Sequence, residues 1–319
     1  MVIKIKNLTK TFELNGGWFA KTKRLVRAVD GVSFGVGQGE TLGLVGESGC
    51  GKSTIGKMIV KLLEPTEGQV LFKGQNIERF GGSRMRTFRR NVQMIFQDSF
   101  SSLNPKMKVA DIIGEALDIH KIASSRAERR RLIEKTLSDV GLHRDHLFRY
   151  PHEFSGGQRQ RINIARSLCL KPEIIICDEP VSSLDVSIQA QIINLLNEIK
   201  KTYSLSYIFI SHDLSVVKHL SDRVAVMYLG KIVELAPKKE LFDQPLHPYT
   251  QALISVIPNP DPKAGGRERI RLKGEVALSA EQLGCNFANR CHFVMDKCRQ
   301  IRPELIAISG QHQVACHLV

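Results

Sequence analysis

The residue types and spacing of a phosphate-binding loop occur in Gly46-Glu47-Ser48-Gly49-Cys50-Gly51-Lys52-Ser53. The loop follows an apolar run at 41–45 and precedes residues 52–63, whose apolar positions recur at helical spacing. Glycines let successive N–H groups curve around an anion, and the start of a helix adds positive potential. A plain glycine turn would not need this strand and helix. We therefore expect nucleotide phosphates to be bound by Gly46, Ser48, Gly49, Cys50, Gly51, Lys52, Ser53 and Thr54, with Ser53 also a Mg²⁺ ligand.

Two adjacent carboxylates, Asp178 and Glu179, follow the apolar run Ile174–Cys177. A buried strand that ends in two carboxylates can offer one to Mg²⁺ and place the other beside an attacking water. The alternative is a helix cap at Asp178 with a solvated Glu179. The phosphate-binding loop elsewhere in the chain favours the first interpretation, in which Asp178 binds Mg²⁺ and Glu179 is the general base.

A third motif, Phe154-Ser155-Gly156-Gly157-Gln158, resembles the signature motif of ABC-type ATPases, with Phe154 where leucine is commoner. Gln97, Asp185 and His212 resemble the family's Q-loop, D-loop and switch residues. Phe12 stands where the family stacks an aromatic side chain on adenine, although Trp18 and Phe19 are nearby candidates. These motifs arrive in the family's order over residues 1 to about 257.

The resemblance implies an ATP hydrolase that uses ATP and Mg²⁺. It implies that Glu179, His212 and Gln97 are catalytic, and that Gln97 also contacts Mg²⁺. The remaining nucleotide contacts that it implies come from Phe12, Ser155, Gly156, Gly157, Gln158 and Asp185. The sequence Ser155-Gly156-Gly157 also opens a helix whose start suits a phosphate. Together with the phosphate-binding loop, the chain then has two phosphate-binding helix starts, which is more than one nucleotide can use. The family resolves this by pairing two subunits head to tail, so that each ATP lies between the phosphate-binding loop of one subunit and the signature motif of the other.

Three segments, 150–155, 186–191 and 245–250, and the C-terminal tail resemble ATP-binding subunits of oligopeptide/dipeptide importers. This resemblance implies a motor subunit that energises peptide import from the cytoplasmic face of the cell membrane, as a peripheral protein. The implied partners are a second, paralogous ATPase subunit in a heterodimer, two transmembrane permease subunits and, indirectly, an extracellular or periplasmic substrate-binding protein. One alternative is import of a non-peptide cargo such as an oligosaccharide or nickel. Another is a soluble ABC ATPase that acts on nucleic acid or ribosomes.

Four of the seven cysteines, Cys285, Cys291, Cys298 and Cys316, lie in the tail. Their spacing lacks the Cys-x-x-Cys pair typical of structural zinc. Four thiolates can hold a [4Fe–4S] cluster, and the resemblance implies that cofactor for this cysteine set. Zn²⁺ and unligated thiols remain alternatives.

Length, composition and charge limit the remaining possibilities. The chain has 319 residues with 42% hydrophobic and 24% charged residues, which is typical of a packed protein. No apolar run approaches the roughly 18 residues of a membrane span, and the N-terminus alternates lysine with isoleucine where a secretory signal would be apolar. We therefore expect the chain to remain in the cytosol.

The net charge of +14 suits an anionic partner, such as nucleic acid or an acidic membrane surface. The arginine run 129–131 shares a helix with Leu132 and Leu137, which favours a solvated helical face, and we expect no nucleic-acid partner.

The elements that must position these motifs alternate between strand and helix, which predicts an α/β fold. With the resemblance, we predict a P-loop NTPase of ABC type over residues 1–257. It should contain an antiparallel β subdomain and a helical subdomain at about 98–160. Residues 258–319 should form a linker and a small C-terminal cysteine-rich module of the oligopeptide/dipeptide-transporter type.

Overall fold

The structure is a computed structural model of the whole chain, and it describes residues 1–15, 23–98, 100–257, 269–272, 274 and 283–319. Trp18, Phe19 and the expected linker from residue 258 lie outside the described residues. The chain divides into two compact units, and each is built from separated segments. Unit 1 comprises residues 1–4, 35–41 and 71–210; unit 2 comprises residues 5–34, 42–70 and 211–319.

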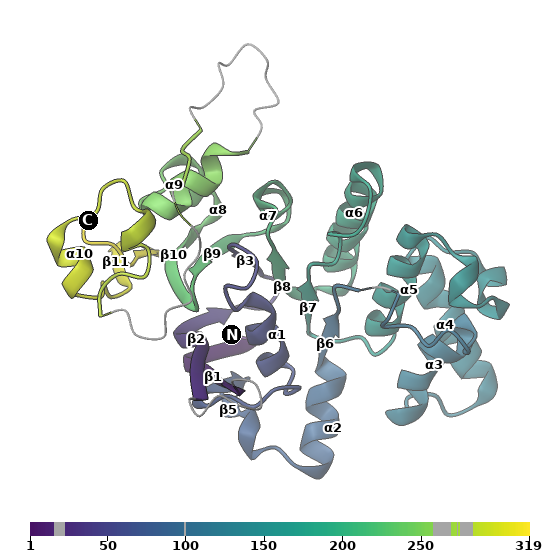
Figure 1. Cartoon of the computed structure of the whole chain (residues 1–319). Coiled ribbons are helices and arrows are strands. Elements are labelled where there is room, and N and C mark those ends of the chain that lie inside the picture. Colours follow the sequence, from purple (N-terminus) through teal and green to yellow (C-terminus); the bar gives the residue numbers. More distant parts are fainter. Residues whose placement is uncertain (16–22, 99, 258–268, 273, 275–282) are drawn as a thin grey trace. The chain divides into compact units, whose positions relative to one another are not determined.

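Unit 2 contains a mixed sheet in the order β11-β12-β10-β9-β3 (Figure 1). β3 and β9 are parallel, whereas β9, β10, β12 and β11 pair antiparallel in turn. Their inner strands are buried, which explains why they appear in the sequence as short continuous apolar runs. The strands are β3 (Thr41–Val45), β9 (Arg223–Tyr228), β10 (Lys231–Pro237), β11 (Ile306–Ser309) and β12 (His312–Val314).

A second sheet in unit 2 contains β2, β1 and β4 in that order. The bounds are β1 (Ile3–Asn15), β2 (Lys23–Val36) and β4 (Glu67–Phe72). The helices of unit 2 are α1 (Lys52–Ile59), α7 (Leu214–Leu220), α8 (Lys238–Asp243), α9 (Pro248–Ser255), η4 (Ala288–Arg290) and α10 (Asp296–Gln300).

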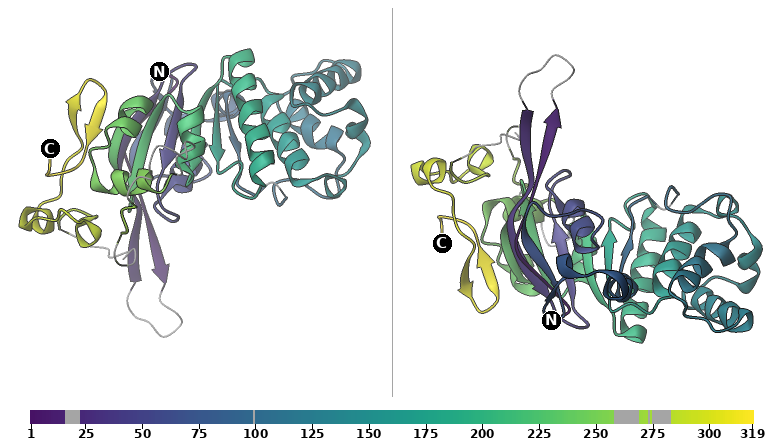
Figure 2. Two further views of the ribbon diagram at one scale, coloured as in Figure 1. Left: turned by 90° about the horizontal axis from the view of Figure 1, so that it is seen from above. Right: turned by 90° about the horizontal axis from the view of Figure 1, so that it is seen from below.

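Unit 1 contains three parallel strands in the order β8-β7-β6. Helices α3, α4 and α5 pack against one another (Figure 2), and α5 also packs on α6 and β6. The strands are β6 (Val92–Ile95), β7 (Ile174–Asp178), β8 (Ser206–Ser211) and β5 (Gln75–Asn76), which pairs with the end of β4. The helices are η1 (Ile77–Arg79), α2 (Gly82–Asn91), α3 (Val109–Ile119), α4 (Arg126–Asp139), η2 (Arg144–Phe148), η3 (Pro151–Glu153), α5 (Gly156–Leu168) and α6 (Val186–Tyr203).

The C-terminal segment does not form the separate cysteine-rich module that the sequence led us to expect. β12 pairs with β10, with Val314 opposite Glu234, so the tail extends the sheet that also contains β3. The helices of the segment at about 98–160 belong to the same compact unit as β6, β7 and β8. The pairing of β12 with β10 is a long-range contact, which local sequence patterns do not record.

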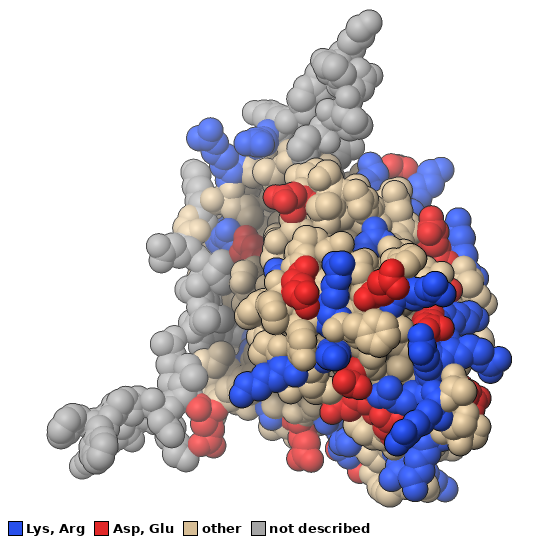
Figure 3. All heavy atoms as spheres, turned by 90° about the vertical axis from the view of Figure 1, so that its right-hand side faces the viewer, with Lys and Arg blue, Asp and Glu red and all other residues tan. Residues whose placement is uncertain are grey.

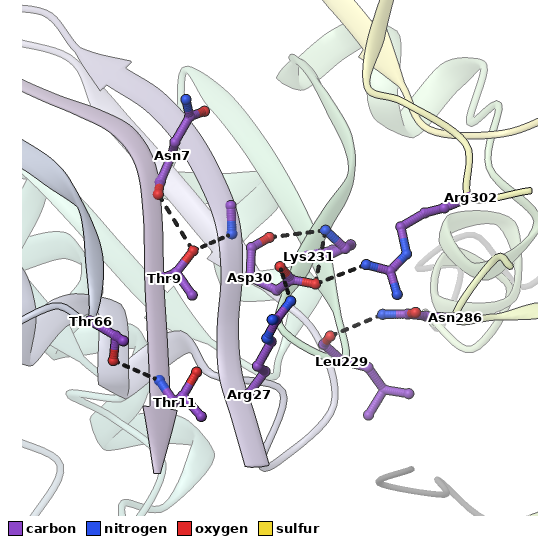
Figure 4. A network of polar contacts seen from close by, with 11 residues as sticks. Asn7, Thr9, Thr11, Arg27, Asp30, Thr66, Leu229, Lys231, Asn286 and Arg302 are labelled. Carbon is purple, nitrogen blue, oxygen red and sulfur yellow. Dashed lines mark hydrogen bonds and ion pairs between the residues drawn. The ribbon is translucent and has the colours of Figure 1, made fainter. Parts of the chain in front are cut away.

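Polar contacts around Asp30 of β2 also hold the tail (Figure 4). The Asp30 carboxylate accepts from Lys231 Nζ at 3.0 Å and from Arg302 Nη1 at 3.1 Å. Asn286 Nδ2 donates to the Leu229 carbonyl at 3.2 Å. The C-terminal segment is therefore bonded to both sheets of unit 2.

A buried carboxylate joins β10, β12 and the segment before α9. Glu234 is fully buried, and it accepts from the N–H groups of Leu246 and His247 at 2.8 and 2.9 Å. Its Oε1 lies 2.8 Å from Nε2 of His312, which is also buried. The buried side chains of Glu234 and His312 are thus partners of one another, as burial of polar groups requires. Among the described residues, no helix has the length and apolar composition to span a bilayer.

We expect Glu234→Ala to lower the free energy of unfolding by about 3 kcal/mol, because the buried His247 N–H, the buried His312 side chain and the partly buried Leu246 N–H each lose a partner. Glu240 provides a matched control, since its half-exposed carboxylate lies 3.6 Å from His312 Nδ1. Glu240→Ala should cost about 0.5 kcal/mol or less. Urea unfolding of the full chain, followed by circular dichroism, measures both values. Equal losses in the two variants would show that Glu234 does not join these elements.

Candidate nucleotide-binding site

The phosphate-binding loop, residues 46–53, connects β3 to α1 and is called the P-loop from here on. Gly46, Gly49 and Gly51 all have positive φ, and Gly51 caps α1 in the left-handed conformation. A Cβ at Gly46 would lie 2.2 Å from the Met227 carbonyl oxygen, and one at Gly51 would lie 2.1 Å from that of Ala28. Only glycine therefore fits where the loop crosses the backbones of β9 and β2.

Lys52 lies at the start of α1 with its side chain almost fully buried. Its Nζ donates to the carbonyl oxygens of Gly46 and Glu47, at 2.8 and 2.9 Å. The ammonium is thus held inside the curve of the loop, next to the positive end of the helix dipole. Ser53 and Thr54 follow in the first turn and are half-buried. This arrangement can bind a polyphosphate, with Lys52 as the charged donor.

The two predicted carboxylates lie at the end of β7 in unit 1. Asp178 is buried as the last residue of the strand, and Glu179 adopts a φ of 45°. The Glu179 N–H donates to the Ile210 carbonyl at 3.0 Å, and Gln97 Nε2 donates to Glu179 Oε2 at 3.0 Å. A positive φ in a residue other than glycine costs of order 1–3 kcal/mol, and such strain is common at functional sites. The structure thus brings Gln97 and Glu179 together.

The signature motif opens α5 through a reciprocal cap. Ser155 Oγ accepts from the Gln158 N–H at 3.3 Å, and Gln158 Oε1 accepts from the Ser155 N–H at 3.1 Å. Phe154 is buried against His146, so the unusual residue of the motif belongs to the core. A Cβ at Gly157 would lie 2.5 Å from the Ile188 side chain, which explains the second glycine.

The remaining predicted residues are exposed. Asp185 is the N-cap residue of α6 in unit 1, whereas His212 follows the end of β8 and belongs to unit 2. Phe12 lies in β1, also in unit 2, with 36% of its surface exposed and Lys10 Nζ 5.4 Å from the ring centroid. An exposed ring near a cation suits stacking on a base.

The four tail cysteines, Cys285, Cys291, Cys298 and Cys316, line one cavity together with His247 and Phe287. Burial raises the pKa of Cys285 to about 11 and also raises the pKa of Cys291 and Cys316, so these thiols are neutral at pH 7 in the absence of a metal. Burial lowers the pKa of His247 to about 4, and its Nδ1 accepts from the Tyr249 N–H. The other three cysteines, Cys50, Cys169 and Cys177, are buried elsewhere.

The predicted iron–sulfur site is not supported by ligand geometry. Within the part of the chain that the structure describes, no group of three or more His, Cys, Asp or Glu side chains is arranged to hold a metal ion. The donor set nevertheless has the right chemistry, because four thiols face a shared space.

Comparison with known proteins identifies the family. Residues 29–182 match the family model "ABC transporter", and residues 233–298 match "Oligopeptide/dipeptide transporter, C-terminal region". The oligopeptide transport ATP-binding protein AppF of Bacillus subtilis is 52% identical, over 99% of this chain and 97% of AppF. The chain belongs to the ATP-binding subunits of ABC transporters.

Other relatives agree with this assignment. OppF of Escherichia coli, an oligopeptide transport ATP-binding protein, is 47% identical over 99% of this chain and 96% of its own length. Among solved structures, the ATP-binding cassette MJ0796, a dimer bound to ADP and Pi, has a TM-score of 0.66 at 27% identity. It covers 74% of this chain, and 98% of MJ0796 is matched. As an ABC ATPase, the chain is expected to use ATP and Mg²⁺ and to hydrolyse ATP.

Some residues of the site were missed by sequence reasoning. Glu47 of the P-loop contacts Tyr249 and Arg290, which lie far along the chain in unit 2. Tyr249 falls in the segment 245–250 that resembles the importer subgroup, and that resemblance was the available signal. Nothing in the sequence pattern pointed to a contact with the P-loop.

We expect Gly51→Ala to lower the free energy of unfolding by at least about 3 kcal/mol. The cost of the strained φ and the cost of the clash between the new Cβ and the Ala28 carbonyl oxygen add together. Gly49→Ala is the matched control, since Gly49 has a φ of 79° but its Cβ would meet open space. It should cost only about 1–2 kcal/mol. Urea unfolding of both variants checks the difference. A Gly51→Ala protein as stable as Gly49→Ala would contradict the packing argument.

Proposed function

We propose that this chain is the ATP-hydrolysing motor subunit that energises import of oligopeptides or dipeptides across the cytoplasmic membrane. One observation carries the proposal: an ABC ATPase and a C-terminal region of the oligopeptide/dipeptide-transporter type occur in one chain. The relatives that match over nearly the full length are named as oligopeptide transport ATP-binding proteins.

In this proposal the P-loop holds the phosphates through Lys52 and its own N–H groups. Ser53 and Asp178 bind Mg²⁺ together with Gln97. Glu179 takes a proton from the attacking water, and Gln97 keeps its carboxylate in place, as the 3.0 Å contact suggests. His212 contacts the γ-phosphate, and Phe12 stacks on the adenine.

The signature residues Ser155, Gly156, Gly157 and Gln158 bind the ATP of a second ATPase subunit, and Asp185 lies at the same interface. The capped start of α5 supports this role, because a helix N-terminus favours a phosphate. ATP then closes the dimer and hydrolysis opens it. The partners are a paralogous ATPase subunit, two transmembrane permease subunits and, indirectly, an extracellular or periplasmic binding protein. The chain is peripheral at the cytoplasmic face.

The charges on one face of the molecule do not favour the nucleic-acid alternative. On the face shown in Figure 3, Lys and Arg side chains are interleaved with Asp and Glu. Two arginines of α4 are paired with acidic side chains: Arg129 with Asp118 at 2.9 Å and Arg130 with Glu134 at 2.8 Å. A continuous basic stripe, which a phosphate backbone requires, is interrupted there.

We expect Glu179→Gln to abolish import, because a glutamine cannot take the proton from water. The rate of ATP hydrolysis should fall by roughly 10²–10⁴-fold, while affinity for Mg-ATP stays within about threefold. The measurement is uptake of labelled peptide by proteoliposomes that hold the complete transporter, with ATP inside and the binding protein outside.

The matched control is Glu173→Gln, which precedes β7 and removes only a half-exposed ion pair with Lys73. This variant should transport normally. Uptake of oligosaccharide or nickel but not peptide would overturn the assigned cargo, and normal turnover in Glu179→Gln would overturn the assigned base.

We also propose that Cys285, Cys291, Cys298 and Cys316 hold a [4Fe–4S] cluster. Their shared cavity supports the proposal. The cluster would crosslink four points of the tail and so stabilise a segment with little core of its own.

Chain purified without oxygen should contain about four iron and four sulfide per molecule. Cys298→Ala should lose most of both, whereas Cys169→Ala should keep them, because Cys169 is buried in unit 1 and is not among the residues that line the cavity. Iron, zinc and sulfide analysis measures the outcome. Stoichiometric zinc without sulfide, or equal metal content in the two variants, would contradict the cluster.

A further inference from the structure

Glu47 is the second residue of the P-loop and provides the loop's one carboxylate. Its N–H donates to the Tyr249 hydroxyl at 2.9 Å, and its Oε2 accepts from Arg290 Nη1 at 2.8 Å. Tyr249 belongs to α9 and Arg290 to η4, so both partners come from the C-terminal part of unit 2. Neither contact is needed to form the loop itself, which the glycines already allow.

Arg290 is well fixed. Its side chain is only 10% exposed, and its guanidinium lies over the Tyr228 ring at 5.8 Å from the centroid. Hydrogen bonds to Glu47 and to the Tyr228 hydroxyl raise the pKa of Arg290 above its ordinary value, so it stays charged. Tyr228, Tyr249 and Phe287 pack edge to face or tilted with centroids 4.7–5.4 Å apart. This packing holds both partners of Glu47, the accepting Tyr249 hydroxyl and the donating Arg290, in one cluster.

These anchors bear directly on Lys52. The two carbonyl oxygens that accept from Lys52 Nζ belong to Gly46 and Glu47, the peptide groups on either side of Glu47. When Tyr249 and Arg290 fix the N–H and the carboxylate of Glu47, they also fix these two carbonyls. Arg290 further neutralises a carboxylate that would otherwise repel the phosphates of ATP.

We propose that Arg290 is a positioning residue for ATP binding, which holds Glu47 and thereby orients Lys52 and cancels the negative charge of the P-loop. The C-terminal region of the transporter family is thus part of the nucleotide site. The proposal rests on ATP binding alone and is independent of the cargo and of the cysteine cluster.

The test compares dissociation constants for Mg-ATP, measured with a fluorescent ATP analogue on the full chain. We expect Arg290→Gln to weaken binding by about tenfold, because the Glu47 carboxylate is left unpaired beside the phosphates. Adding Glu47→Gln to Arg290→Gln should recover at least half of this loss on a logarithmic scale. The dissociation constant of Arg290→Lys should lie between those of the unmodified chain and Arg290→Gln. The loss should also shrink as salt is raised, since charge repulsion is screened.

Arg302→Gln is the matched control. Arg302 also ties the C-terminal segment to another part of unit 2 through an ion pair, but its partner is Asp30 of β2, at 3.1 Å (Figure 4). This variant should bind Mg-ATP like the unmodified chain. If Arg290→Gln does not fold, Tyr249→Phe tests the same anchor and should weaken binding by about threefold, because the Glu47 N–H loses its acceptor.

Unchanged affinity in folded Arg290→Gln, an equal loss in Arg302→Gln, or no recovery with Glu47→Gln would each overturn the proposal. An unmodified chain that binds no ATP would instead contradict the proposed ATPase function, so the two failures are distinguishable.

Discussion

Two carbonyl oxygens fix the path of the P-loop. The backbone at Gly46 passes against Met227 of β9, and the backbone at Gly51 passes against Ala28 of β2, so closely that no Cβ fits at either position. This contact of backbone on backbone sets where α1 begins, and with it the direction of the helix dipole and the place of Lys52. β9 is held in place by its pairing with β3 and β10, and Ala28 is held within the strand β2.

The residues that we propose for ATP hydrolysis come from both units. The proposed phosphate-binding residues, Phe12 and His212 belong to unit 2, whereas Asp178, Glu179, Gln97 and the signature motif belong to unit 1. Glu179 stores backbone strain and is held by Gln97 within the same unit. The proposed phosphate-binding lysine, Lys52, and the proposed general base, Glu179, therefore belong to different compact units.

Local features of the fold could be predicted from the sequence because their causes are local. The apolar runs at 41–45 and 174–177 lie in the strands β3 and β7, and the helical spacing from residue 52 marks the start of α1. The predicted helix from Lys52 ends four residues early, at Ile59, because Lys61 adopts a left-handed φ of 55°. Periodicity does not show such a local change.

Long-range contacts could not be predicted in this way. β12 has only three residues, and a strand this short has no periodicity of its own, so its pairing with β10 was missed. Glu234 lies inside an apolar strand, and its buried carboxylate is stabilised by hydrogen bonds from N–H groups outside that strand. Arg290 and Glu47 are separated by 243 positions, and their pairing depends on how the chain returns to the P-loop. For the tail cysteines, the resemblance named four residues that line one cavity, but among the described residues no group is arranged to hold a metal ion.

The discontinuity of unit 2 has a consequence for biosynthesis. Its residues come from 5–34, 42–70 and 211–319, so β9, β10 and β12 leave the ribosome long after the P-loop. Because chains are made from the N-terminus, the nascent P-loop lacks Met227, Tyr249 and Arg290 until translation is almost finished. A chain whose synthesis stops before residue 290 would lack Arg290, the partner of the Glu47 carboxylate.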